Sequence, residues 1–163
     1  MNVSEQPIDD EMMGSIRGCA TDALMVLGPE FVSEDPPAVV EAIDAFAYRW
    51  QKGDRPAADV VEDTEQARLI FGSLWGEQLV KQFGWQWAQV NFGENSFTFG
   101  VVSPDRSMVI NPLDFLLDCL SNPGVDVTVM LAFNMLLERS IPQMRPRSYI
   151  DVMQGVHRIV PRD

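Results

Sequence analysis

The hydrophobic periodicity of the chain changes between residues 72 and 112, and this change constrains the fold more than any other feature of the sequence. Apolar residues recur at helical spacing up to Gly84, and beyond it they alternate with polar residues over 87–92 and 96–101. Residues 93–95, between these two runs, are Gly-Glu-Asn, a composition typical of a tight turn. The pattern therefore predicts a helix followed by a β-hairpin.

A third strand and a further helix are predicted after the hairpin. Ser103-Pro104-Asp105-Arg106 has proline at the second position of a turn, so residues 108–110 are expected to return as an antiparallel strand. Asn111 can cap a helix that has Pro112 at its first position and leucines at helical spacing up to residue 120. The three strands together predict an antiparallel meander with one face toward helices.

Three amphipathic helices are predicted before the meander, with expected bounds of 9–27, 35–52 and 63–83. Gly28 is a typical stop for the first helix, and Asp35 can cap the second, which opens on Pro36-Pro37. Asp63 can cap the third helix, with Gln66 at its N3 position.

The C-terminal part of the chain is also predicted to be mainly helical. Asp126 is expected to start a fifth helix that is apolar on nearly all sides from residue 127 to 137, as a central buried helix is. Residues 148–160 fit a short sixth helix or a strand, and the pattern leaves both open.

These elements predict a single α+β domain over residues 1–163. We expect three N-terminal helices, a three-stranded antiparallel meander and two or three C-terminal helices, packed in two layers. The expected subdivisions are an acidic helical hairpin at 8–53, a helix–meander–helix core at 62–122 and C-terminal helices at 125–163.

Two glycines and two tryptophans mark a candidate pocket near the start of the meander. Gly72 and Gly76 lie four residues apart on one side of the third helix. Their missing side chains allow close packing of the meander or of the 127–137 helix, or the approach of a ligand or partner backbone. Trp85 and Trp87 are expected on one face of a strand, as core residues or as a recognition platform.

Glu77 is the candidate acid of this pocket. If its side chain points inward it requires a hydrogen-bonding or charged partner, because an unpaired buried carboxylate is very costly. Arg106 and Arg68 are candidates for an ion pair, and a hydrogen bond to backbone amides is the alternative. The candidate pocket residues are Gly76, Glu77, Trp85, Trp87 and Arg106.

The negative charge of the chain is concentrated in its first part. The net charge is −12, and residues 1–65 hold fifteen acidic and four basic residues, a net charge of −11. Such a field repels phosphate backbones and anionic lipid, so neither nucleic acid nor a membrane surface is an expected partner. Acidic helices can simply keep a protein soluble, or they can bind a basic protein partner. The candidate partner-binding residues are Glu34, Asp35, Glu41 and Asp44.

The sequence offers few residues for catalysis or metal binding. His157 is the one histidine, and the two cysteines, Cys19 and Cys119, are a hundred residues apart, so we expect no metal site, no cofactor and two buried free thiols. The first residues are acidic where an export signal would be basic and then apolar, so we expect a cytoplasmic protein.

Part of the chain resembles a family of uncharacterised bacterial domains. The family pattern is a Leu-Gly-x-x-x-Gly-Glu helix, a Gly-x-x-Trp strand and a Ser-Pro-Asp turn before a proline-led helix. The matching positions are 71–77, where Phe71 replaces the leucine, then 84–87, 103–105 and 111–112. This resemblance implies the fold and a bacterial origin only. The layout is similar, more loosely, to immunity proteins that bacteria pair with secreted toxins.

Two functions follow as hypotheses. The first is a non-catalytic binding protein, such as an immunity-type inhibitor that docks on a basic protein through acidic N-terminal helices. The second is a small hydrolase or ligand-binding enzyme that uses Glu77 in a cleft beside Trp85 and Trp87.

Overall fold

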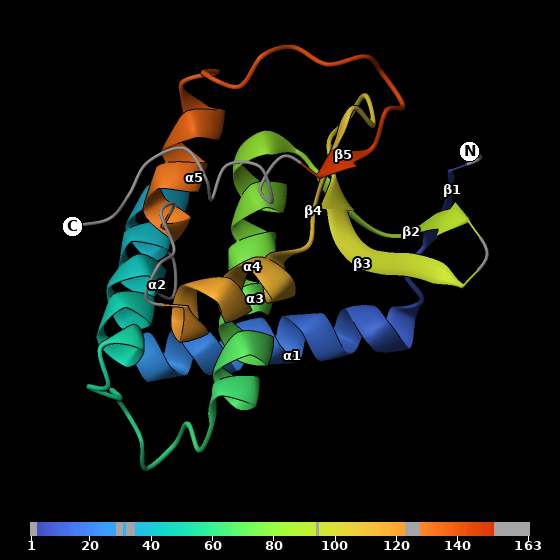
Figure 1. The fold of residues 1–163 in the computed structure, drawn as a ribbon. Coiled ribbons are helices and arrows are strands. Elements are labelled where there is room, and N and C mark those ends of the chain that lie inside the picture. Colours follow the sequence, from blue (N-terminus) through green and yellow to red (C-terminus); the bar gives the residue numbers. More distant parts are fainter. Residues whose placement is uncertain (1–2, 29–30, 32–34, 94, 123–127, 152–163) are drawn as a thin grey trace.

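The computed structural model describes residues 3–28, 31, 35–93, 95–122 and 128–151, which form an α+β fold of five helices and five strands (Figure 1). The helices are α1 (Asp10–Leu27), α2 (Pro36–Gln51), α3 (Thr64–Phe83), α4 (Pro112–Ser121) and α5 (Val129–Leu137). The strands are β1 (Ser4–Pro7), β2 (Gln86–Gly93), β3 (Ser96–Val102), β4 (Met108–Ile110) and β5 (Ile150–Asp151). No helix in these ranges has the length and apolar character needed to cross a membrane.

The predicted antiparallel meander is confirmed as the centre of a larger sheet. The strand order is β1-β2-β3-β4-β5, with antiparallel pairing among the first four strands and parallel pairing between β4 and β5. β1 was not predicted, because its Ser-Glu-Gln-Pro sequence lacks the alternating apolar residues that indicate a strand. Within the 148–160 segment, Ile150–Asp151 is a strand, and residues 152–160 lie outside the described part of the chain.

The helix ends follow the predicted capping chemistry with two corrections. Asp63 accepts a hydrogen bond from the Gln66 amide, and Asn111 accepts one from the Asp114 amide. Asp35 occupies the N-cap position of α2, but its side chain makes no capping hydrogen bond. The fifth helix begins at Val129, because the Thr128 hydroxyl accepts a hydrogen bond from the Leu131 amide and caps the helix; the predicted start at Asp126 lies outside the described residues.

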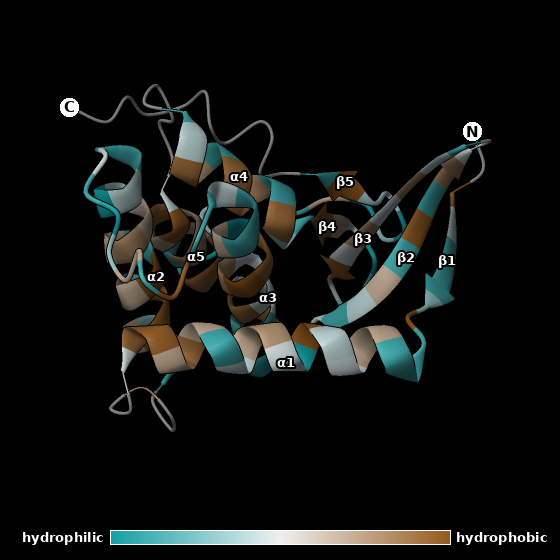
Figure 2. Cartoon of the chain, turned by 90° about the horizontal axis from the view of Figure 1, so that it is seen from below, coloured by the Kyte–Doolittle hydropathy of each residue, from teal (hydrophilic) through white to brown (hydrophobic). Residues whose placement is uncertain are grey.

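The main core lies among the helices, where α3 packs against both α1 and α4 and α2 packs against α5. Trp75 of α3 is completely buried, and its ring lies beside Phe115 and Phe133 of the two C-terminal helices. In Figure 2 the hydrophobic colours gather among α2, α3, α4 and α5, away from the far end of the β2–β3 hairpin. α1 crosses behind the lower part of α3 and extends from the α2 end of the molecule to the strands (Figure 1).

The two glycines of α3 allow close packing, one of the two explanations offered by the sequence. A Cβ atom on Gly76 would lie 2.2 Å from Trp87 Cζ2 of β2, and one on Gly72 would lie 2.8 Å from the Leu113 Cα of α4. Side chains at either position would therefore push α3 away from the meander and from α4. The contacting elements are β2 and α4, and not the fifth helix that was the alternative packing partner.

The opposite face of the sheet carries a smaller cluster and a polar network that joins distant parts of the chain. The Arg106 guanidinium donates to both carboxylate oxygens of Glu5, at 3.0 and 3.1 Å, and to Gln86 at 3.0 Å. The Tyr149 hydroxyl donates to the same Glu5 carboxylate at 3.0 Å. Glu5 of β1 thereby links the N-terminal strand to the turn before β4 and to the residue that precedes β5.

Candidate functional site

The residues of the predicted pocket do not gather at one site. Glu77 is half-buried, and its Oε1 accepts a hydrogen bond from the indole Nε1 of Trp87 at 3.0 Å. Trp85 precedes β2 and packs against Phe83, with 6.4 Å between ring centroids. Both tryptophans are buried in the core. Arg106 lies instead in the Glu5 network, so the five predicted residues are divided between two places.

Neither candidate arginine pairs with Glu77 in the contacts that the structure shows. Arg106 binds Glu5, and Arg68 binds Glu65 at 2.9 Å and Asp114 at 3.0 Å. Glu77 remains half-exposed to solvent and needs only the indole N–H as a protein donor, so burial does not force it to find a cation.

The predicted partner-binding acids differ in their surroundings. Glu34 lies outside the described residues, whereas Asp35 and Glu41 are exposed on α2. Asp44 is half-buried, and its carboxylate accepts a hydrogen bond from the Met130 amide in the first turn of α5 at 3.3 Å. An acidic side chain at this position stabilises the positive end of a helix dipole. Asp44 therefore has a structural role that Asp35 and Glu41 do not share.

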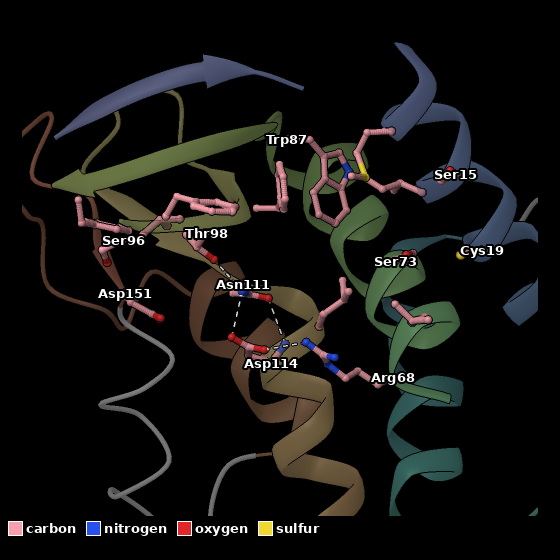
Figure 3. Close-up of a pocket in the computed structure, with 18 residues that line it drawn as sticks. Ser15, Cys19, Arg68, Ser73, Trp87, Ser96, Thr98, Asn111, Asp114 and Asp151 are labelled. Carbon is pink, nitrogen blue, oxygen red and sulfur yellow. Dashed lines mark hydrogen bonds and ion pairs between the residues drawn. The ribbon is translucent and has the colours of Figure 1, made fainter. Parts of the chain in front are cut away.

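A groove of about 740 Å³ lies between α1, α3, the start of α4 and β3 (Figure 3). We call it the groove below. Its lining is mainly apolar, and the apolar residues include Met12, Leu69, Phe92, Phe97, Phe99 and Leu113. Trp87 also lines it, but Glu77 and Trp85 do not. The alternation of the sequence did not reveal this site, because its lining comes from seven separate elements, α1, α3, α4, β2, β3, β4 and β5.

One wall of the groove is held by a chain of hydrogen bonds (Figure 3). The Asn111 amide nitrogen donates to Thr98 Oγ1 at 2.7 Å and to Asp114 Oδ2 at 3.0 Å. The other Asp114 oxygen accepts from Arg68 Nη2 at 3.0 Å. These contacts connect β3, α4 and α3, so the position of the wall relative to β3 is fixed before any ligand arrives.

The phenylalanines of β3 are the exposed apolar surface of the groove. Phe97 is 57% exposed and Phe99 is 37% exposed, and their rings meet edge to face with 5.4 Å between centroids. Val101 continues the same face of β3 and is completely buried. Phenylalanine side chains are usually buried in a domain core, so two exposed ones beside a hollow indicate a contact surface.

Cys19 also lines the groove, where it is half-buried and not fully buried as predicted, whereas Cys119 is buried. Burial raises the pKa of the Cys19 thiol, as does the negative charge of Asp22, and a hydrogen bond from Ser73 only partly opposes this. The thiol is therefore a poor nucleophile near neutral pH. Among the described residues, no group of three histidine, cysteine, aspartate or glutamate side chains is arranged to hold a metal ion.

Comparisons with known proteins leave the chain without an assigned family. No protein-family model, curated protein or solved structure matches it. The resemblance to uncharacterised bacterial domains and the looser likeness to immunity proteins stay predictions, and the functional argument depends on the geometry of the groove.

Proposed function

We propose that this chain is a non-catalytic binding protein, and that its groove receives an apolar, basic segment of a protein partner. The observation that carries this proposal is the pair of exposed rings, Phe97 and Phe99, beside a fixed groove of about 740 Å³. Clusters of aromatic side chains of this kind are common at the energetic centres of protein interfaces. An immunity-type inhibitor of a basic protein would belong to this class.

The charges around the groove support a basic segment. The charged residues of the lining are Arg68, Asp114 and Asp151, and Arg68 is already paired with Asp114 and with Glu65 outside the lining. Among the described residues of the lining, carboxylates therefore exceed cations, in a chain whose net charge is −12. Complementary charge raises the rate of encounter and disfavours acidic competitors.

The groove lining supports binding better than catalysis. Its thiol, Cys19, has a raised pKa, and its one described arginine is held by two carboxylates. Of the three residues of the enzyme hypothesis, Trp87 lines the groove, whereas Trp85 and the candidate acid Glu77 do not. No observation therefore favours the hydrolase as a second candidate.

Selection of peptides from a random dodecapeptide library displayed on phage, with the whole chain as the target, tests the proposal. We expect the selected peptides to be enriched in lysine or arginine together with apolar residues. The tightest one, synthesised with a fluorescent label, should bind Phe97→Ser at least 10-fold more weakly than the natural chain. Met25→Ser is the matched control, because Met25 is 73% exposed on α1 and does not line the groove.

Three results would overturn the proposal: no enriched peptide, enrichment without basic residues, or equal loss of affinity in the Phe97 and Met25 variants. A separate variant, Glu41→Lys, tests whether exposed acids of α2 take part in the encounter. If they do, the association rate falls and its dependence on salt becomes weaker, while the dissociation rate stays the same.

A further inference from the structure

β3 is paired on both sides over only part of its length. β2 pairs with β3 along most of the strand, from Val102 to Ser96. β4 pairs only with Val101 and Val102, because Asn111 and Pro112 begin α4 directly after Ile110. In the described part of the chain, residues 96–100 of β3 therefore have a strand on one side and the groove on the other. We call this second side the open edge.

The pairing pattern shows which backbone groups lie along the open edge. The Ser103 amide donates to the Met108 carbonyl at 3.0 Å, so Ser103 directs its backbone groups toward β4. In an antiparallel strand, every second residue directs its N–H and C=O to the same side. Val101, Phe99 and Phe97 therefore direct theirs to this side as well. Val101 has Ile110 opposite it, whereas Phe97 and Phe99 have no described strand opposite them.

The open edge lacks the features that normally prevent strand pairing. Proteins protect exposed edges with charged side chains, proline, bulges or a covering element. Residues 96–100 are Ser-Phe-Thr-Phe-Gly and contain neither a charge nor a proline. The one irregularity of the hairpin lies between Asn91 and Gly93, on β2. The Asn111 amide nitrogen donates to Thr98 Oγ1 at 2.7 Å, so the start of α4 lies close to Thr98 on this edge.

From this geometry we propose that the partner segment binds by adding a strand to β3. The segment lies antiparallel to β3, in the continuation of β4, and exchanges backbone hydrogen bonds with Phe97 and Phe99. Its apolar side chains on the ring-bearing face contact those two phenylalanines. This inference rests on the proposed function, since it specifies how the same groove holds its partner.

Replacement of Phe97 by proline and by alanine separates backbone pairing from side-chain contact. Both substitutions remove the ring, but only proline removes the N–H that points to the open edge. Proline is tolerated where a strand N–H is not used in the sheet, so the β2–β3 pairing is preserved. We expect Phe97→Pro to bind the selected dodecapeptide at least 10-fold more weakly than Phe97→Ala. The near-ultraviolet circular dichroism of both variants should show that the core is intact.

N-methylation of single backbone nitrogens in the dodecapeptide gives an independent test. In strand addition, every second N–H of the bound segment is used, so affinity should fall with a period of two residues along the peptide. If affinity falls only with apolar side-chain substitutions, and Phe97→Pro equals Phe97→Ala, strand addition is wrong. The proposed function would then stand, because the groove would still bind the peptide.

Amide hydrogen exchange shows whether the open edge is available in the free protein. We expect the amides of Phe97 and Phe99 to exchange rapidly in the free chain and at least 10-fold more slowly with the peptide bound. Slow exchange in the free chain at every concentration would mean that the chain covers its own edge. Protection that rises with protein concentration would mean that a second copy covers it. Either result overturns the inference.

Discussion

The base and the tip of the β2–β3 hairpin share the same alternation of apolar residues, but the base is buried and the tip is exposed. At the base, Trp87 is paired with Val101, and both are buried against α3. At the tip, Phe97 and Phe99 continue the face of Val101 and are exposed. The difference lies in what covers this face of the strands. Gly76 lets α3 pack directly on the base, whereas Phe97 and Phe99 at the tip line the groove. An alternating apolar pattern specifies a face, and the neighbouring elements decide how much of it is buried.

The largest expected effect comes from closing the space at the base. Gly76→Ala places a methyl group 2.2 Å from Trp87 Cζ2 and 3.0 Å from Pro112 Cγ. The Trp87 indole is buried and donates a hydrogen bond to Glu77, so it cannot move away freely. We expect a loss of about 3 kcal/mol in the free energy of unfolding, measured by urea denaturation.

Gly14→Ala is the matched control for this substitution. Gly14 is also inside a helix, α1, but a Cβ atom there would meet nothing within 4 Å. Because alanine has the higher helix propensity, we expect Gly14→Ala to stabilise the chain by up to about 1 kcal/mol. Equal destabilisation by both variants would show that the close approach of α3 to β2 is not what Gly76 provides.

Trp87→Phe tests the same base from the strand side, with a smaller expected effect. The smaller ring leaves part of its site empty and removes the N–H that Glu77 accepts at 3.0 Å. We expect a loss of about 2 kcal/mol in the free energy of unfolding. Glu77→Gln keeps an oxygen acceptor for the indole and should cost less than about 1 kcal/mol. A greater loss of stability in Glu77→Gln than in Trp87→Phe would indicate that the Glu77 carboxylate, and not the packing of the Trp87 ring, stabilises the base of the hairpin.

The base of the hairpin was largely predictable from the sequence, because local signals specify it. Gly84 ends α3 in a left-handed conformation with φ of 70°, as a C-terminal glycine does, and the period of the apolar residues changes directly after it. Gly72 and Gly76 indicated a close approach of the meander or of the fifth helix. The meander is confirmed at Gly76, which faces Trp87 of β2, whereas the contact of Gly72 with α4 was not predicted. That information depends on contacts between distant residues, which no local pattern contains.

The groove and β1 were not predictable for the same reason, and for residues 148–160, which include β5, the pattern left a strand and a helix both open. β1 has no apolar alternation, and β5 has two residues, so each is a strand only because a neighbouring strand supplies its hydrogen bonds. The Arg106 partner was wrongly predicted, because Glu5 is 101 residues away in the sequence. The open edge of β3 follows from where β4 ends, and that point was predicted from Asn111 and Pro112 without its consequence for β3.

The Glu5 network on the opposite face of the sheet tests whether an ion pair contributes to the stability of the fold. Burial raises the pKa of Glu5, but hydrogen bonds from Arg106 and Tyr149 and the Arg106 charge outweigh it, so the pKa lies below the usual value of 4.5. Ionised Glu5 therefore stabilises the fold above pH 4.5, and this contribution is lost as the pH falls through the lower pKa of the folded state.

Glu5→Gln should remove that contribution. We expect the variant to be less stable than the natural chain by about 1 kcal/mol at pH 7, because the ion pair is only partly buried. Urea denaturation at a series of pH values should show the two stabilities converging as the pH falls below 4.5. A difference that does not change with pH would mean that Glu5 acts through its shape and neutral hydrogen bonds, and not through its charge.

The smallest expected effect on stability belongs to the tip. Phe97→Ala removes a ring that is 57% exposed and contacts Phe99 edge to face, so the free energy of unfolding should fall by only about 0.5 kcal/mol. Val101→Ala on the same face of β3, where the side chain is completely buried, should cost more, about 1 to 2 kcal/mol. Urea denaturation of the two variants under one condition gives the comparison directly. If Phe97→Ala costs as much as Val101→Ala, the tip is part of the folded core in solution, and Phe97 is not available to a partner. If the expected order holds, a large loss of peptide affinity in Phe97→Ala cannot be attributed to unfolding, and the two ends of one strand have separate roles in stability and in binding.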